Sequence, residues 1–120
     1  MNGYVDDAGR ALLDLEVRAS AGSAASLLTV WIDTAFTGEL VVSRKLIESL
    51  ALPQSAAVMA GLADGSQVVL ETFTCIIDWF GAERTVEVVA NDGQFPLLGV
   101  GLLLNRRLEV DYPKQTITLS

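Results

Sequence analysis

The stretch from Val30 to Ser43 constrains the fold more than any other part of this sequence. Apolar residues run directly into Asp33, small residues then make a short turn, and a second apolar run begins at Leu40. Two such runs on either side of one turn predict a carboxylate held at the end of a buried strand. A turn that only reverses the chain more often uses Asn-Gly or Asp-Gly, with its charge in water. Asp33 instead lies in the most apolar part of the sequence, where ionising a carboxyl group is costly.

The turn after Asp33 has residues suited to a tight connection. The hydroxyls of Thr34 and Thr37 can bond to nearby backbone groups, and Gly38 allows a positive φ. From the loop alone, two interpretations of Asp33 stay open. It is either a functional carboxylate or a structural aspartate that caps its own turn.

The composition of the 120-residue chain narrows the possible chemistry. It has no histidine, which excludes Ser-His and Cys-His nucleophilic machinery and most zinc sites. Its single cysteine, Cys75, cannot form an internal disulfide, and we interpret it as a core thiol in a reducing compartment. The net charge of −7 argues against nucleic acid as a partner, since phosphates require a basic surface.

Hydrophobic residues make up 51% of the sequence, which is enough for a single domain over residues 1–120 with its own core. No apolar run approaches the roughly 20 residues needed to cross a bilayer. The first residues also lack the basic start and apolar stretch of a signal peptide. We therefore expect no membrane partner and a cytoplasmic location.

Alternating apolar and polar residues predict short strands along most of the chain. The expected strands cover residues 3–5, 11–18, 26–32, 40–42, 56–63, 67–79, 84–90, 108–112 and 115–119. The run 67–79 is too long for one straight strand, so we expect it to bend or change partners near Glu71 and Thr72. Asp64-Gly65 between two β-prone runs is a strong hairpin signal.

Helical periodicity is limited to short segments. We expect one helix over residues 44–52, with Ser43 as its N-cap and Pro53 after its end. Many short strands with one or two short helices favour a mostly β fold, a closed barrel or sandwich.

Three segments together resemble the retropepsin-like aspartic proteases (clan AA), in particular the small single-domain type of prokaryotes. Asp33-Thr34-Ala35-Phe36-Thr37-Gly38 resembles their active-site loop, Asp-Thr/Ser-Gly preceded by hydrophobic residues. The hairpin Leu62-Ala63-Asp64-Gly65-Ser66 occupies the place of the flap that closes over bound peptide. Leu97-Leu98-Gly99 resembles the element that crosses behind the catalytic loop, and a short helix is expected after it. The segments occur in the order that this family requires.

The resemblance implies an aspartic endopeptidase with an acid-protease fold. It assigns catalysis to Asp33, Thr34 and Ala35, and substrate covering to Leu62, Ala63, Asp64, Gly65 and Ser66. The resemblance assigns support of the catalytic loop to Phe36, Thr37, Gly38, Leu98 and Gly99. It implies no cofactor and no metal.

A twofold homodimer follows from the chemistry of this reaction. Peptide hydrolysis by this route needs two carboxylates that share one proton, with a water between them. The chain has one such loop, so the second carboxylate would be Asp33 of another copy. By the resemblance, Thr34 would bond across the twofold, and the flaps would cover an extended polypeptide substrate. The terminal segments 3–5 and 116–119 are candidates for dimer strands, since their apolar residues would otherwise leave exposed edges.

One position departs from the family's pattern, because Ala35 stands where glycine is usual. Alanine keeps the backbone N–H and adds one methyl group, so the loop can form if φ at this residue is negative. The methyl group affects how closely a substrate can approach the loop.

Two other functions stay open at this point. The first is a retropepsin-fold peptide-binding or dimerisation module with little or no turnover, which Ala35 and the acidic composition leave room for. The second, a metal enzyme that uses clustered carboxylates, lacks ligands at usable spacing.

Overall fold

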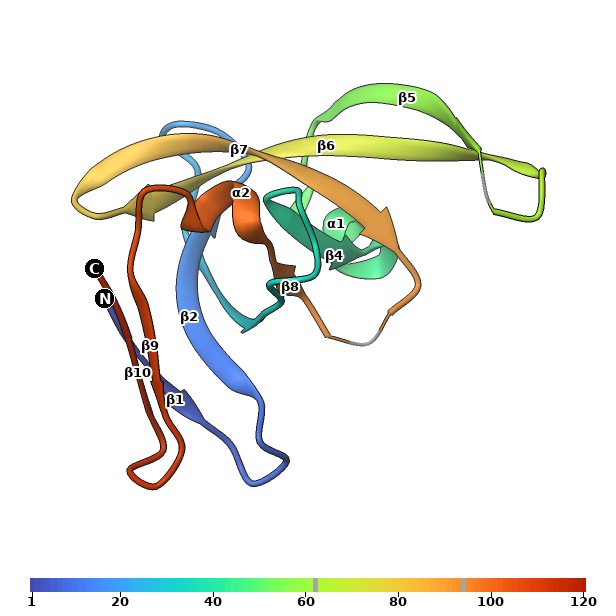
Figure 1. Ribbon diagram of the computed structural model, residues 1–120. Helices are drawn as coiled ribbons and strands as arrows, with labels where there is room; N and C mark the ends of the chain where they lie inside the picture. The colour runs from blue at the N-terminus through green and yellow to red at the C-terminus, as the bar shows by residue number, and fades with distance from the viewer. Residues whose placement is uncertain (62, 94) are drawn as a thin grey trace.

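In a computed structural model of the protein, the described residues form ten β-strands, which pair in a single sheet, and two short helices (Figure 1). The structure describes residues 1–61, 63–93 and 95–120, without the side chains of Val58 and Ala60. The strands are β1 (Asn2–Val5), β2 (Ala11–Arg18), β3 (Ser26–Ile32), β4 (Leu40–Ser43), β5 (Gln54–Gly61), β6 (Gln67–Trp79), β7 (Ala82–Asn91), β8 (Leu97–Leu98), β9 (Leu108–Asp111) and β10 (Thr116–Leu119). The helices are α1 (Arg44–Leu50) and α2 (Val100–Leu103).

The middle of the sheet closes on itself. The strand order is β5-β6-β7-β4-β8-β3-β2-β1-β10-β9, and β6 also pairs with β2. This extra pairing joins β6, β7, β4, β8, β3 and β2 into a ring and leaves β5 and β9 as the outermost strands. The closed, mostly β architecture expected from the strand pattern is therefore confirmed.

The ring encloses the hydrophobic core. Along β2, Leu13, Leu15 and Val17 are buried and the residues between them face solvent, as their alternation predicts. The most deeply buried side chains of the other elements include Val30, Leu40, Ile77, Val86, Val88, Leu98, Leu102, Ile117 and Leu119. Burying one such side chain contributes about 1.5–3 kcal/mol, so the core accounts for most of the driving force for folding.

Strand β6 changes partners where the sequence predicts it. It pairs with β5 over Gln67–Phe73, and beyond this point the same side of β6 pairs with β2 at Ile76 and Ile77. Pairing with β7 on the opposite side begins at Thr72. The outer half of β6 therefore belongs to a two-stranded arm with β5, which projects from the ring (Figure 1).

Helix α1 begins as expected and ends earlier. The Ser43 hydroxyl accepts a hydrogen bond from the Leu46 amide (3.2 Å), which is an N-cap interaction. The helix ends at Leu50, not at residue 52, because Ala51 adopts a left-handed conformation (φ 54°). Among the described residues, no helix combines the length and apolar character needed to span a membrane.

The two termini lie side by side and pair within the chain (Figure 1). Strand β10 has β1 on one side and β9 on the other along its whole length. Strand β1 also pairs with β2 at Tyr4 and Val5. The expectation that segments 3–5 and 116–119 offer free edges for a dimer is therefore wrong, because these edges are occupied within one chain. The unpaired outer edge in this region belongs to β9.

Candidate active site

Asp33 lies directly after the last residue of β3, at the centre of the sheet. Strand β3 pairs in parallel with β8, with Ile32 beside Leu98. The Asp33 amide donates a hydrogen bond to the Leu98 carbonyl (2.8 Å), so the ladder continues through the aspartate itself. Its side chain is half-buried. The backbone of this carboxylate is thus held by a strand that lies 65 residues further along the chain.

The Asp33 carboxylate also organises its own turn. Its Oδ1 accepts a hydrogen bond from the Ala35 amide (2.9 Å), and its carbonyl accepts one from the Phe36 amide (3.2 Å). Ala35 is not among the residues with positive φ, so the methyl group is accommodated without strain. Thr34 is exposed, and within the described part of the chain its hydroxyl has no hydrogen-bond partner.

The Phe36 ring packs against two glycines that support the loop. A Cβ atom added at Gly38 or at Gly99 would overlap this ring, so both positions require glycine. The Phe36 carbonyl accepts a hydrogen bond from the Val100 amide (2.7 Å), and the Gly38 carbonyl accepts one from the Gly101 amide (2.9 Å). Contacts around the loop thus involve Phe36, Gly38 and Gly99, and the supporting role assigned to residues 36–38 and 98–99 stays a prediction.

A second anchor holds the end of the loop, and no local sequence signal predicts it. The Glu39 carboxylate accepts hydrogen bonds from the Glu87 amide (2.8 Å) and from the Arg84 guanidinium (2.9 Å). The Arg84 guanidinium also donates a hydrogen bond to the carbonyl of Gly101, within α2 (3.4 Å). Arg84 therefore joins the two segments that enclose the Asp33 loop. Burial, with a smaller contribution from the charge of Glu39, raises the pKa of the core thiol Cys75 to about 12.

A cavity of about 370 Å³ opens at Asp33. It is lined by Trp31, Ile32, Asp33, Thr34 and Leu97, so a single carboxylate faces apolar walls. A groove of this size and composition suits one or two side chains of a bound peptide.

An aromatic and basic cluster borders this cavity, and sequence reasoning missed it. The Trp31 and Phe95 rings pack edge to face with centroids 6.2 Å apart, and the Arg10 guanidinium lies 4.6 Å from the Phe95 centroid. Asp6 accepts from the Arg10 backbone amide (2.9 Å) and side chain (2.7 Å). The backbone amide of Arg10, followed by its side chain, lowers the pKa of Asp6. Arg10, Trp31 and Phe95 come from distant segments, and no local spacing connects these three.

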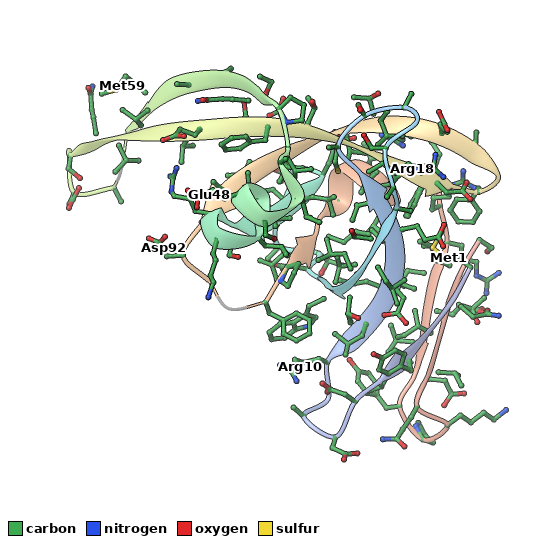
Figure 2. All side chains as sticks on the ribbon, turned by 180° about the vertical axis from the view of Figure 1, so that it is seen from behind. Met1, Arg10, Arg18, Glu48, Met59 and Asp92 are labelled. Atoms are coloured by element: carbon green, nitrogen blue, oxygen red, sulfur yellow. The ribbon has the colours of Figure 1, made fainter. Side chains whose placement is uncertain are left out.

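The hairpin tip lies away from Asp33. Ala63, Asp64, Gly65 and Ser66 form the expected turn, with Gly65 at positive φ, whereas Leu62 lies outside the described residues. Oδ1 of Asp64 accepts from the Ser66 hydroxyl (2.6 Å) and amide (2.9 Å), and these bonds lower the pKa of Asp64. None of the described tip residues lines the cavity. Figure 2 shows Met59 of the arm far from Arg10, which borders the cavity.

Comparisons with known proteins identify the fold. The crystal structure of a retropepsin-like aspartic protease from Rickettsia conorii matches with a TM-score of 0.65 at 14% identity, covering 99% of this chain and 88% of that chain. The solution structure of the Simian Foamy Virus (mac) protease matches with a TM-score of 0.52 at 18% identity, covering 76% of this chain and 91% of that chain. Neither a protein-family model nor a curated protein sequence matches. The chain therefore has the retropepsin-like fold, as its three sequence segments predict.

The described residues contain no cluster of three or more His, Cys, Asp or Glu side chains arranged to hold a metal ion. The described residues that line the cavity include one carboxylate, Asp33, and one hydroxyl, Thr34.

Proposed function

We propose that two copies of this chain form an aspartic endopeptidase in which Asp33 of each copy supplies one catalytic carboxylate. The observation that carries this proposal is the setting of Asp33. Its carboxylate follows a barrel strand, is fixed by backbone bonds on both sides, and opens into an apolar cavity. A carboxylate held in this way is preorganised to act on a substrate without moving.

The reaction requires two carboxylates in different protonation states. Two carboxyl groups about 3 Å apart share one proton, because like charges at this distance do not both ionise. The ionised member takes a proton from a water molecule, and the oxygen of this water attacks the scissile carbonyl carbon. The protonated member donates a hydrogen bond to the carbonyl oxygen. The proton taken from water then passes to the amide nitrogen as the C–N bond breaks.

The second carboxylate is expected from another copy because the described residues place none beside the first. Asp33 is the one carboxylate among the residues that line the cavity. The nearby Asp6 is engaged by Arg10 through its amide and its guanidinium. Twofold symmetry would bring two copies of the same loop together, and the exposed Thr34 hydroxyl is available to bond across the axis.

The proposed substrate is an extended polypeptide. Trp31, Ile32 and Leu97 give the cavity apolar walls that suit side chains next to the scissile bond. The arm formed by β5 and β6, with residues 62–66 at its tip, would close over the peptide in the dimer. This role of the tip requires a movement or a partner, since its described residues do not line the cavity of the single chain.

A second candidate is a peptide-binding or dimerisation module of the same fold without turnover. The observation that favours it is the distance of the hairpin tip from Asp33, which leaves the cavity uncovered. Such a module would retain the dimer and the peptide groove.

The decisive experiment is cleavage of a diverse peptide library between about pH 4 and 7 by the wild-type protein and by Asp33→Asn. The proposal expects cleavage by the wild type and at least a thousandfold loss in the variant, with an unchanged sedimentation profile. Cleavage that survives in the variant would refute the aspartic mechanism. A folded dimer without cleavage in either protein would favour the binding module.

A further inference from the structure

A guanidinium lies beside the Asp33 cavity, and the proposed reaction does not use it. The guanidinium carbon of Arg10 lies 5.9 Å from the centroid of the Trp31 ring, which belongs to the cavity wall. It lies 4.6 Å from the centroid of Phe95, the ring that packs edge to face on Trp31. Arg10 itself does not line the cavity, so its positive charge lies just beyond an apolar wall.

The turn between β1 and β2 fixes the position of this side chain. Oδ1 of Asp6 accepts hydrogen bonds from the amides of Ala8 (3.0 Å) and Arg10 (2.9 Å), and Oδ2 accepts one from Nε of Arg10 (2.7 Å). Gly9 adopts a positive φ, and the Asp6 amide donates to the Arg10 carbonyl (3.1 Å). An arginine held in this way loses little conformational entropy when it binds a further group.

The outer edge of the Arg10 guanidinium remains accessible to a ligand. Asp6 engages Nε, and no hydrogen bond joins either Nη atom to another described residue. The side chain is 35% exposed. The two Nη atoms present parallel N–H groups that match the two oxygens of a carboxylate. In a polypeptide, glutamate and aspartate side chains supply such a carboxylate.

We infer that Arg10 selects substrates that carry a glutamate two residues away from the apolar side chain in the cavity. This inference rests on the part of the proposed function that places an extended polypeptide beside Asp33. Side chains two residues apart on an extended chain lie on one face, roughly 7 Å from each other. Arg10 lies at a similar distance beyond the Trp31 ring, so a glutamate side chain at that position reaches its Nη atoms.

The charges around the cavity restrict this preference to one position of the peptide. A glutamate inside the cavity would face the Asp33 carboxylate, and like charges repel. The net charge of −7 also opposes an acidic peptide at long range. Salt at about 0.15 M screens this long-range repulsion. A preference for glutamate at a single position therefore reports the local contact with Arg10.

Binding of matched peptides to the Asp33→Asn variant tests the preference without cleavage. Each peptide has one leucine among serine and alanine residues, with glutamate or glutamine two residues before it or two residues after it. Trp31 lies in the cavity wall, so its fluorescence reports binding. Asp6 offsets part of the charge of Arg10, and both side chains are partly exposed. We therefore expect glutamate to improve the dissociation constant about fivefold over glutamine at one of the two positions. Glutamate in place of the leucine should weaken binding.

Arg10→Gln and Arg18→Gln form a matched pair of variants in the same Asp33→Asn protein. Both arginines pair with one carboxylate, and their side chains are 35% and 29% exposed. Figure 2 shows them at opposite ends of β2, so Arg18 is far from the rim. We expect Arg10→Gln to abolish the preference for glutamate, Arg18→Gln to leave it unchanged, and Arg10→Lys to keep part of it.

The ratio of the two dissociation constants distinguishes recognition from support of the cavity wall. If Arg10 only holds Trp31 and Phe95 in place, Arg10→Gln will weaken the binding of both peptides equally. An unchanged ratio in this variant would overturn the inference, and so would the absence of measurable binding of any peptide to Asp33→Asn.

These outcomes separate the specificity of the cavity from its catalysis. If the wild type cleaves through Asp33 but glutamate and glutamine peptides bind equally well, the inference fails alone. If the preference for glutamate depends on Arg10 and the wild type cleaves no peptide, the role of Arg10 holds and the proposed catalysis fails.

Discussion

The Asp33 loop and the arm formed by β5 and β6 are both hairpin-like connections, yet they are held in opposite ways. Segments far away in the sequence hold the loop, through the carbonyl of Leu98 and the amides of residues 99–101. The tip of the arm is held by its own residues, as Asp64 binds Ser66 two positions away. One segment is fixed by the core, whereas the other depends on local bonds.

The exposure of the side chains differs between the Asp33 loop and the arm in the same way. Leu98, behind the loop, is fully buried, whereas Met59 and Val69 of the arm are 61% and 57% exposed. An arm whose described apolar side chains are largely exposed has a low cost of movement. The contrast indicates a loop fixed by the core and an arm held by local bonds, and matched substitutions in the two regions test it.

The largest difference is expected between two leucines. Leu98→Ala removes a fully buried side chain behind the Asp33 loop and should destabilise the protein by about 2–5 kcal/mol. Leu70→Ala, in the arm, truncates a side chain that is 37% exposed and should cost less than about 1 kcal/mol. Urea denaturation followed by fluorescence measures both values. Equal losses would show that the arm is packed as firmly as the core.

Two glycines provide a smaller but more local comparison. In Gly99→Ala, the added Cβ would overlap the Phe36 ring and the Gly38 carbonyl, and we expect about 1–3 kcal/mol of destabilisation. In Gly61→Ala, the added atom meets nothing within 4 Å, so stability should stay within about 0.5 kcal/mol. Gly99→Ala should also lower the rate of cleavage, because the shift that makes room for the added Cβ atom displaces the Asp33 loop. Unchanged cleavage would argue against a catalytic role of this loop geometry.

The sequence predicted the loop well because its signals are local. Asp33 follows an apolar run, the turn residues are small, and the alternation in β2 marks its buried face, so neighbouring residues alone indicate these elements. The hairpin at Asp64-Gly65 is equally local. Even the substitution at Ala35 could be judged in advance, since its backbone amide still reaches the Asp33 carboxylate.

The remaining features depend on pairing between distant segments, which one sequence does not reveal. Glu39 and Arg84 lie 45 residues apart, and only the parallel pairing of β4 with β7 brings them together. The position of β1 between β2 and β10 also depends on pairing between distant segments. Because of this pairing, the prediction that segments 3–5 and 116–119 offer free edges for a dimer was wrong. No local pattern indicates which side of a short strand will be occupied.

A third comparison uses the ion pairs that anchor each region. Glu39→Gln weakens the bonds to Arg84 and to the Glu87 amide, and we expect a loss of about 1 kcal/mol. Glu71→Gln removes the ion pair with Arg44 at the base of the arm, which is partly exposed, and should cost at most about 0.5 kcal/mol. If Glu39 positions the loop, its variant should also lower kcat with little change in KM, whereas Glu71→Gln should not. A change in KM alone would contradict this positioning role.

The smallest expected effect concerns the reactivity of the sulfur atoms. It involves no change in the free energy of unfolding at neutral pH. Burial raises the pKa of Cys75 to about 12 from its usual 9.0, so the thiol should resist alkylation in the folded protein. Below pH 9 this cysteine is protonated in both states and contributes no pH dependence. Between pH 9 and about 12 the unfolded chain loses this proton first, so stability falls as pH rises.

Met59, on the exposed arm, should behave in the opposite way, with its thioether oxidised by dilute peroxide while Cys75 stays intact. Peptide mass spectrometry after brief treatment separates the two sulfurs. Early modification of Cys75 would mean that the ring opens as readily as the arm moves. The contrast between a fixed Asp33 loop and a mobile arm would then no longer hold, since both regions would share one opening equilibrium.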